Sequence, residues 1–145
     1  MHNLRAARLA EHGRSPTVRP MVAAYLWINA AIYLIFSLWC TVRPTQTAAA
    51  SGFLTLDNSG RSEYLVVYGG LQLGLAAFFA LLAVTPDLHR LGLLFSLAIY
   101  VAIVAYRVVT VIVFRPVSSV TLGIAGLEVA LLVAAFLLWW LRRPL

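Results

Sequence analysis

Hydrophobic residues in this chain are gathered into four long runs, and polar stretches separate one run from the next. Each run is long enough to cross a hydrocarbon layer of ~30 Å, which takes roughly 20 residues of α-helix. The pattern therefore predicts an all-α, polytopic membrane protein. The short connections between the last three runs favour an antiparallel four-transmembrane-helix bundle. The expected spans are about residues 21–41, 64–85, 91–114 and 117–141, which form one membrane domain over residues 21–141.

Residues 1–20 are polar and basic. We expect a solvated cytoplasmic tail here; an interfacial helix over residues 3–12 is the alternative. With this tail inside, seven arginines lie on the cytoplasmic side and three on the other, so the positive-inside rule places both termini in the cytoplasm. The cytoplasmic set is Arg5, Arg8, Arg14, Arg19, Arg90, Arg142 and Arg143, and the outer set is Arg43, Arg61 and Arg115.

Residues 42–63 form the only long loop and are predicted to be extracytoplasmic. Phe53, Leu54 and Leu56 give the loop an apolar centre, and residues 57–60 carry a strong turn signal. A plain connector is the preferred interpretation, and a lid resting on the membrane surface is the alternative. Small residues at positions 47–51 would also suit a signal-peptidase site, but the first run is longer than a secretory signal requires.

Composition agrees with a membrane protein. The chain has 145 residues, 62% of them hydrophobic and 11% charged, whereas a soluble domain is roughly half apolar and about a quarter charged. The net charge of +6 comes from 11 basic residues that are all arginine, and most lie beside span ends. Topology accounts for them, so nucleic acid is not an expected partner. Cys40 is the only cysteine, which excludes an intrachain disulfide.

Arg107 and Glu128 are the only ionisable acid and base inside the expected spans. Either side chain facing lipid would cost at least ~2.5 kcal/mol, so both are expected to face inward. Each lies ten or eleven residues from the turn near Val117 and Ser118, which puts them at the same depth on neighbouring helices. The spacing predicts an ion pair.

Further polar residues reach a similar depth on the other spans. They are Gln72, Tyr68, Tyr100 and Asn29, which together with Arg107 and Glu128 make up the predicted polar cluster. Two interpretations compete. In one, the charges only neutralise each other and fix the register of two helices. In the other, the cluster lines a pocket open to the outer leaflet and binds a polar headgroup or an acidic metabolite.

The second span contains small residues that favour close helix packing. Gly70 and Gly74 form a small-x-x-x-small pair next to Gly69, and we expect these glycines to pack against another helix. A weak repeat relates residues 70–73 to residues 126–129, which makes Gln72 equivalent to Glu128 if it is real. Glu63 precedes the second span, where a carboxylate favours the helix N-terminus.

Recognisable catalytic or metal-binding patterns are missing from the sequence. The histidines, His2, His12 and His89, lie outside the expected spans and lack metal-ligand spacing. No phosphate loop, nucleophile elbow or Cys-x-x-Cys pair occurs. We therefore assign no catalytic residue, no metal and no cofactor, and favour a non-enzymatic role.

The run Glu63-Tyr64-Leu65-Val66-Val67-Tyr68-Gly69-Gly70-Leu71-Gln72-Leu73-Gly74, with Arg107 and Glu128 downstream, resembles a domain-of-unknown-function family of small bacterial four-helix membrane proteins. The resemblance covers roughly residues 21–141. It implies a four-helix fold in a bacterial inner membrane, and it implies that Glu63, Tyr68, Gly69, Gly70, Arg107 and Glu128 belong together. The plan is more loosely similar to DoxX-like membrane proteins, which are tied to redox partners.

The leading hypothesis is a non-enzymatic inner-membrane protein whose buried polar cluster binds a small or lipidic ligand or organises an assembly. Expected partners are the bilayer, such a ligand, and a second copy or a larger membrane protein. The alternatives are a DoxX-like redox accessory subunit that meets quinone, with Cys40 as its thiol, and a purely structural envelope protein.

Overall fold

The computed structural model describes residues 18–142, and every element in that range is helical. The predicted all-α fold is confirmed for this part of the chain. Most of the basic tail, with Arg5, Arg8, Arg14 and the histidines His2 and His12, lies outside the described residues. The elements are α2 (Val18–Val42), α3 (Pro44–Ala50), α4 (Asn58–Tyr64), the π-helix η1 (Leu65–Leu71), α5 (Gln72–Val84), the 3-10 helix η2 (Pro86–Leu88), α6 (His89–Val113) and α7 (Ser119–Leu141).

Four continuous helical stretches are long and apolar enough to cross a membrane. They are Val18–Val42, Asn58–Val84, Pro86–Val113 and Ser119–Leu141. Each expected span overlaps one of them. The largest difference is at the second stretch, which begins at Asn58 rather than near Tyr64, because α4 runs directly into η1 and α5.

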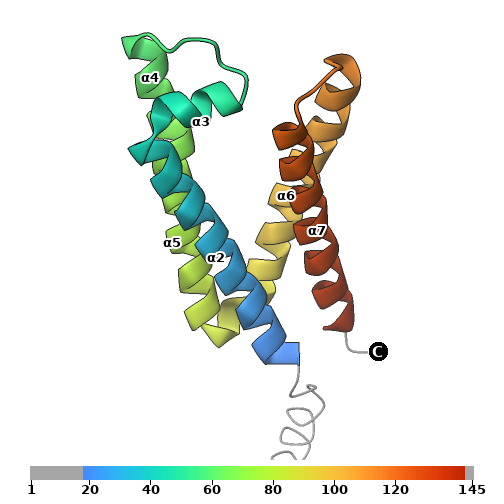
Figure 1. Cartoon of the computed structure of the whole chain (residues 1–145). Coiled ribbons are helices and arrows are strands. Elements are labelled where there is room, and N and C mark those ends of the chain that lie inside the picture. The colour runs from blue at the N-terminus through green and yellow to red at the C-terminus, as the bar shows by residue number, and fades with distance from the viewer. Residues whose placement is uncertain (1–17, 143–145) are drawn as a thin grey trace, which may run out of the picture.

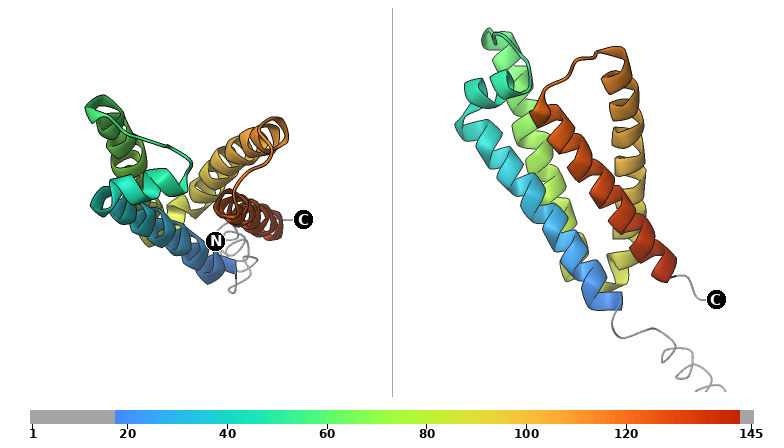
Figure 2. Two further views of the ribbon diagram at one scale, coloured as in Figure 1. Left: turned by 45° about the horizontal axis from the view of Figure 1, so that its top comes forward. Right: turned by 45° about the vertical axis from the view of Figure 1, so that its right-hand side comes forward.

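The helices are arranged as two pairs (Figures 1 and 2). In the first pair, α2 packs along η1 and α5; in the second, α6 packs along α7. The pairs meet at the end that holds η2 and the start of α2, which we call the closed end. They diverge toward the end that holds α3, α4 and the 114–118 turn, which we call the open end (Figure 1).

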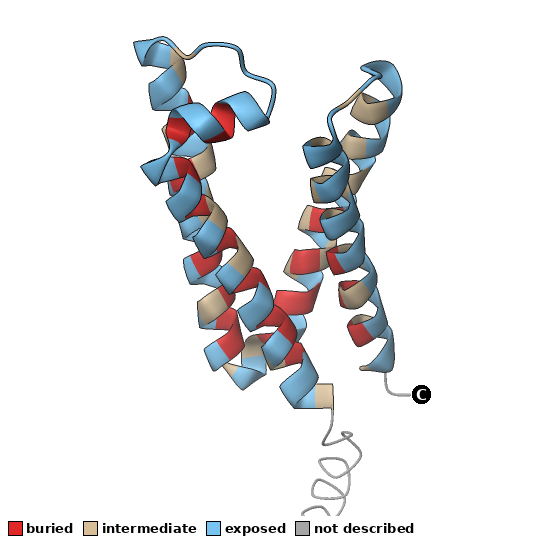
Figure 3. Ribbon diagram, viewed as in Figure 1, coloured by how far each residue is buried: buried red, intermediate tan, exposed pale blue. Residues whose placement is uncertain are grey.

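In the second helix pair, the buried residues lie toward the closed end, whereas in the first pair they occur along its whole length (Figure 3). The main core joins Leu26 of α2, Phe79 and Leu82 of α5 and Leu93 of α6, all fully buried. Gly92 permits the close approach of α6 to α2, since a Cβ atom there would lie 2.9 Å from Leu26 Cδ2. In contrast, no residue from 101 to 130 is buried. The open half of the second pair is therefore not covered by any other described part of the chain.

The segment between the first two spanning stretches is partly folded. Pro44 begins α3, as its fixed φ favours, and Cys40, Ala48 and Tyr64 form a small second core beneath it. The apolar centre of the segment is divided. Leu56 packs against that core, and the Phe53 ring meets the Tyr64 ring edge-on, whereas Leu54 is 98% exposed.

Candidate functional site

A bidentate ion pair lies on the open half of the second helix pair. Arg107 Nε donates to Glu128 Oε2 at 2.9 Å, and Arg107 Nη2 donates to Glu128 Oε1 at 2.8 Å. Arg107 lies six residues before the end of α6 and Glu128 nine residues after the start of α7. At ~1.5 Å rise per residue, each lies roughly 9–14 Å inside its helix end. The two charges meet at one level, as the spacing along the chain indicated.

The pair is only partly shielded. The side chains of Arg107 and Glu128 are 31% and 13% exposed. A guanidinium carries five N–H groups. The two hydrogen bonds to Glu128 use only Nε and Nη2, and the amino group Nη1 makes no hydrogen bond among residues 18–142. Both charged side chains therefore keep unused hydrogen-bonding capacity.

Tyr68, another residue of the predicted cluster, lies in η1 of the first helix pair, whereas Arg107 and Glu128 belong to the second pair. The Tyr68 ring stacks on the Tyr64 ring, with their centroids 4.6 Å apart.

Two other predicted cluster residues bind each other nearer the closed end. Tyr100 Oη donates to Asn29 Oδ1 at 2.5 Å, and Asn29 Nδ2 donates to the Tyr25 carbonyl oxygen at 2.8 Å. Both side chains are almost completely buried. Gln72 is half-buried and makes no hydrogen bond with any described residue. The predicted cluster is therefore divided into two parts. One is the buried contact between Tyr100 and Asn29, and the other is the partly exposed Arg107–Glu128 ion pair.

A polar stripe on α2 was not predicted, although one of its members, Asn29, was. Tyr25 Oη donates to the Leu131 carbonyl oxygen at 3.1 Å and so joins α2 to α7. Ser37 Oγ donates to the Gly69 carbonyl oxygen at 2.8 Å. Tyr25, Asn29, Tyr33 and Ser37 recur at every fourth position, which places them along one helix face. That spacing was the available signal.

The Tyr-Gly-Gly motif lies within the π-helix η1. The two glycines of the motif differ in role. Gly69 lies against α2, where a Cβ atom would be 2.9 Å from Thr41 Oγ1. Gly70 and Gly74 have no atom within 4 Å of the position of a Cβ. Within the described chain, Gly69 lies against α2 and the Gly70–Gly74 pair does not, so the packing of that pair against another helix stays a prediction. Wider π-turns of this kind occur often at functional sites.

The position of Glu63 within its helix also differs from the one expected. Asp57 is the N-cap of α4, and its Oδ1 accepts a hydrogen bond from the Gly60 backbone N–H at 2.6 Å. Glu63 lies six residues further along, next to the last residue of α4. The predicted helix N-terminus at Glu63 is wrong, because the turn signal at residues 57–60 begins the helix a turn and a half earlier.

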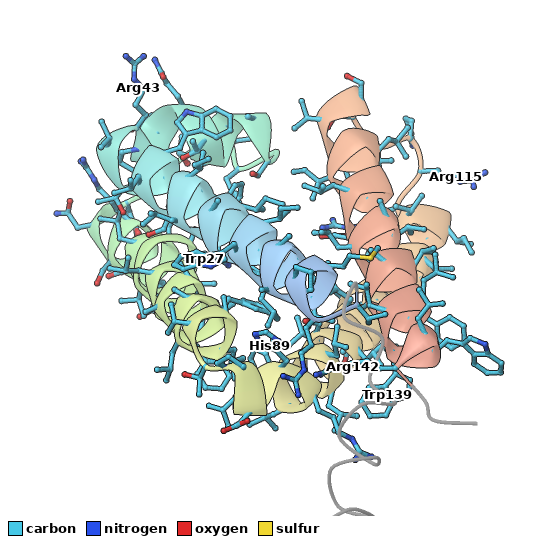
Figure 4. The ribbon with its side chains drawn as sticks, turned by 90° about the horizontal axis from the view of Figure 1, so that it is seen from below. Trp27, Arg43, His89, Arg115, Trp139 and Arg142 are labelled. Atoms are coloured by element: carbon cyan, nitrogen blue, oxygen red, sulfur yellow. The ribbon has the colours of Figure 1, made fainter. Side chains whose placement is uncertain are left out.

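The closed end carries aromatic and basic side chains, several of which Figure 4 labels. His89 begins α6 and is buried, and its Nε2 donates to the Ala83 carbonyl oxygen at 3.2 Å. The Arg90 guanidinium lies 5.5 Å from the ring centroid of Trp139. His89 thus belongs to the candidate spanning stretch Pro86–Val113, whereas it was expected to lie outside the spans. Within residues 18–142, no three metal-ligating side chains come together.

An apolar groove lies between α2 and α5. Its volume is about 370 Å³, and polar atoms contribute nothing to its surface. It is lined by Trp27, Ala30, Ala31, Leu34, Leu73, Ala76, Ala77 and Ala80. None of the residues of the predicted cluster lines this groove.

Cys40, the thiol of the redox alternative, is fully buried in the second core. The Tyr64 hydroxyl donates to Cys40 Sγ at 3.5 Å. The thiol is therefore enclosed by α2, α3 and α4 and lies apart from the ion pair.

Residues 21–141 match a protein family described as Domain of unknown function (DUF4345). No curated protein and no solved structure matches the chain. The resemblance to a domain-of-unknown-function family is confirmed, and the looser similarity to DoxX-like proteins is not supported by these comparisons. The chain belongs to the DUF4345 family.

Proposed function

We propose that this member of the DUF4345 family is a non-enzymatic multi-pass membrane protein that binds an amphipathic ligand at the Arg107–Glu128 pair. The observation that carries the proposal is the placement of a bidentate ion pair on a stretch, residues 101–130, in which no residue is buried. A ligand between the two helix pairs would cover what the chain itself leaves uncovered.

Membrane energetics support this assignment. Charged side chains at membrane depth usually face a bundle interior or a water-filled cavity, because facing acyl chains is costly. Arg107 and Glu128 are paired, yet the Arg107 side chain keeps 31% of its surface exposed. Acyl chains cannot meet the hydrogen-bonding capacity that Arg107 and Glu128 leave unused, so this capacity needs a polar partner. The incomplete enclosure favours a polar group brought by a ligand.

The proposed orientation follows from charge. We place both termini in the cytoplasm of a bacterium, in an antiparallel four-span arrangement within the inner membrane, because seven arginines then lie inside and three outside. The open end, with α3 and the 114–118 turn, then faces the extracytoplasmic side. A ligand would enter from the outer leaflet.

Assembly is a second candidate function, and one observation favours it. Gly70 and Gly74 are exposed and have open space around them, and a small-x-x-x-small pair lets another helix approach closely. A second copy or a larger membrane protein could pack on this face without involving the ion pair.

The experiment for the ligand compares three full-length proteins purified in mild detergent. They are the natural chain, the double variant Arg107→Leu with Glu128→Leu, and the control Ala77→Leu, which narrows the apolar groove. Native mass spectrometry should find a co-purified small molecule on the natural chain and on the control, and none on the double variant. Equal retention by all three proteins would refute the ligand site, and loss only from the control would assign binding to the groove.

A further inference from the structure

We infer that the ligand is a zwitterionic phospholipid whose headgroup bridges Arg107 and Glu128, with its phosphate on the arginine and its ammonium on the glutamate. This inference rests on the proposed function, since it names the chemistry of the ligand at that same site. It selects a net-neutral headgroup over the acidic metabolite that the sequence also allowed.

The first step is the charge balance of the site. One guanidinium and one carboxylate are joined by two hydrogen bonds of 2.8 and 2.9 Å, so the site is neutral overall. No other acidic or basic side chain lies between Leu91 and Phe114 or between Val117 and Leu141. A ligand with a net charge would bring that charge to membrane depth without a counter-charge, which is strongly unfavourable at low dielectric. A zwitterion brings no net charge.

The second step is the hydrogen-bonding capacity that the pair leaves unused. Among residues 18–142, Arg107 Nη1 retains two N–H donors, and each carboxylate oxygen of Glu128 accepts only one hydrogen bond. A phosphate can accept from Nη1, and an ammonium can donate to a Glu128 oxygen, so both new contacts are charge-assisted. An uncharged headgroup such as a glycerol hydroxyl could satisfy only the weaker, neutral form of these contacts.

The third step concerns the source of the zwitterion. The exposed residues next to the pair on both helices are large and apolar, including Val108, Val109, Leu127 and Val129. A free, water-soluble zwitterion would gain nothing from this surface, whereas the acyl chains of a phospholipid would cover it. We therefore assign the ligand to the bilayer.

The test offers the purified full-length protein mixed micelles with equal amounts of phosphatidylethanolamine, phosphatidylglycerol and diacylglycerol. After a wash with lipid-free detergent, native mass spectrometry counts the lipids that each protein retains. The natural chain should retain phosphatidylethanolamine over phosphatidylglycerol by roughly tenfold, the ratio expected when one charge is left without a partner. Free glycerophosphoethanolamine at the same concentration should not displace the lipid.

Charge variants sharpen the test. Glu128→Gln leaves an unpaired guanidinium, so its preference should reverse toward phosphatidylglycerol. The charge swap Arg107→Glu with Glu128→Arg keeps the site neutral and should keep the preference for phosphatidylethanolamine, which matters if Glu128→Gln does not fold. Ala77→Leu should behave like the natural chain.

Failure of the inference is distinguishable from failure of the proposed function. Preferential retention of phosphatidylglycerol or diacylglycerol by the natural chain would overturn the zwitterion assignment while leaving a ligand site in place. Displacement by free glycerophosphoethanolamine would overturn the lipid source. If the natural chain retains no lipid of any class beyond the double leucine variant, both the inference and the proposed function fail.

Discussion

The closed and open halves of this molecule handle polar groups in opposite ways. At the closed half, Tyr25 reaches the Leu131 carbonyl and Tyr100 reaches Asn29, so these hydrogen bonds join the two helix pairs and are buried. At the open half, Arg107 binds Glu128 within one helix pair, and both remain partly exposed. The polar contacts of the closed half therefore cross between the pairs and are used up within the bundle. The Arg107–Glu128 contact stays within one pair and leaves both charged side chains partly open to a further hydrogen-bonding partner.

The largest expected effect comes from removing one charge of the open half. Arg107→Leu alone strands Glu128 at membrane depth and should lower the free energy of unfolding by about 3–5 kcal/mol. The double variant Arg107→Leu with Glu128→Leu should be close to the natural chain in stability. Reversible unfolding in mixed micelles measures both. If the single and double variants unfold alike, the charges do not depend on each other.

A smaller loss is expected at the buried contact of the closed half. Asn29→Leu removes the acceptor of the Tyr100 hydroxyl and leaves that hydroxyl buried without a partner, which costs about 1–3 kcal/mol. Adding Tyr100→Phe should restore part of the loss, because the orphaned hydroxyl is removed. The same unfolding assay applies. No recovery in the double variant would mean that Asn29 acts through packing rather than through this hydrogen bond.

Two glycines allow a matched comparison of the halves. Gly92→Ala at the closed half places a methyl group 2.9 Å from the fully buried Leu26, and overpacking of this kind costs about 1–3 kcal/mol. Gly126→Ala at the open half meets nothing within 4 Å, so it should be neutral or slightly stabilising through its higher helix propensity. Thermal unfolding of both variants would test this. Equal losses would show that the open half is packed as tightly as the closed half.

The smallest loss of stability is expected at Tyr25. Tyr25→Phe removes the single hydrogen bond to the Leu131 carbonyl, and such bonds between membrane helices contribute ~0.6 kcal/mol on average. A loss well above ~2 kcal/mol would indicate that this bond, rather than apolar packing, holds the two helix pairs together.

The sequence was sufficient for the helices and for the level of the ion pair, because both depend on lengths along the chain. It was insufficient to predict which side of each helix packs on another helix. Helices α5 and α7 carry apolar residues on every side, so no periodicity distinguishes a packed face from a lipid face. The π-helix η1 shifts which glycine meets α2, and for that reason Gly69 packs instead of Gly70. The divergence of the two pairs depends on side-chain packing between helices far apart in sequence, which local patterns do not record.

The difference between the halves can be measured directly with a photo-crosslinking residue at two sites on one face of α6. Leu97 packs against the main core at the closed half, and Val104 lies seven residues further on, in the uncovered stretch beside Arg107. In membranes under illumination, the probe at Leu97 should cross-link to α2 or α5 of the same chain, and the probe at Val104 should form an adduct with a phospholipid. Intramolecular cross-links from both positions would contradict the account, because the ion pair would then be enclosed by the protein alone.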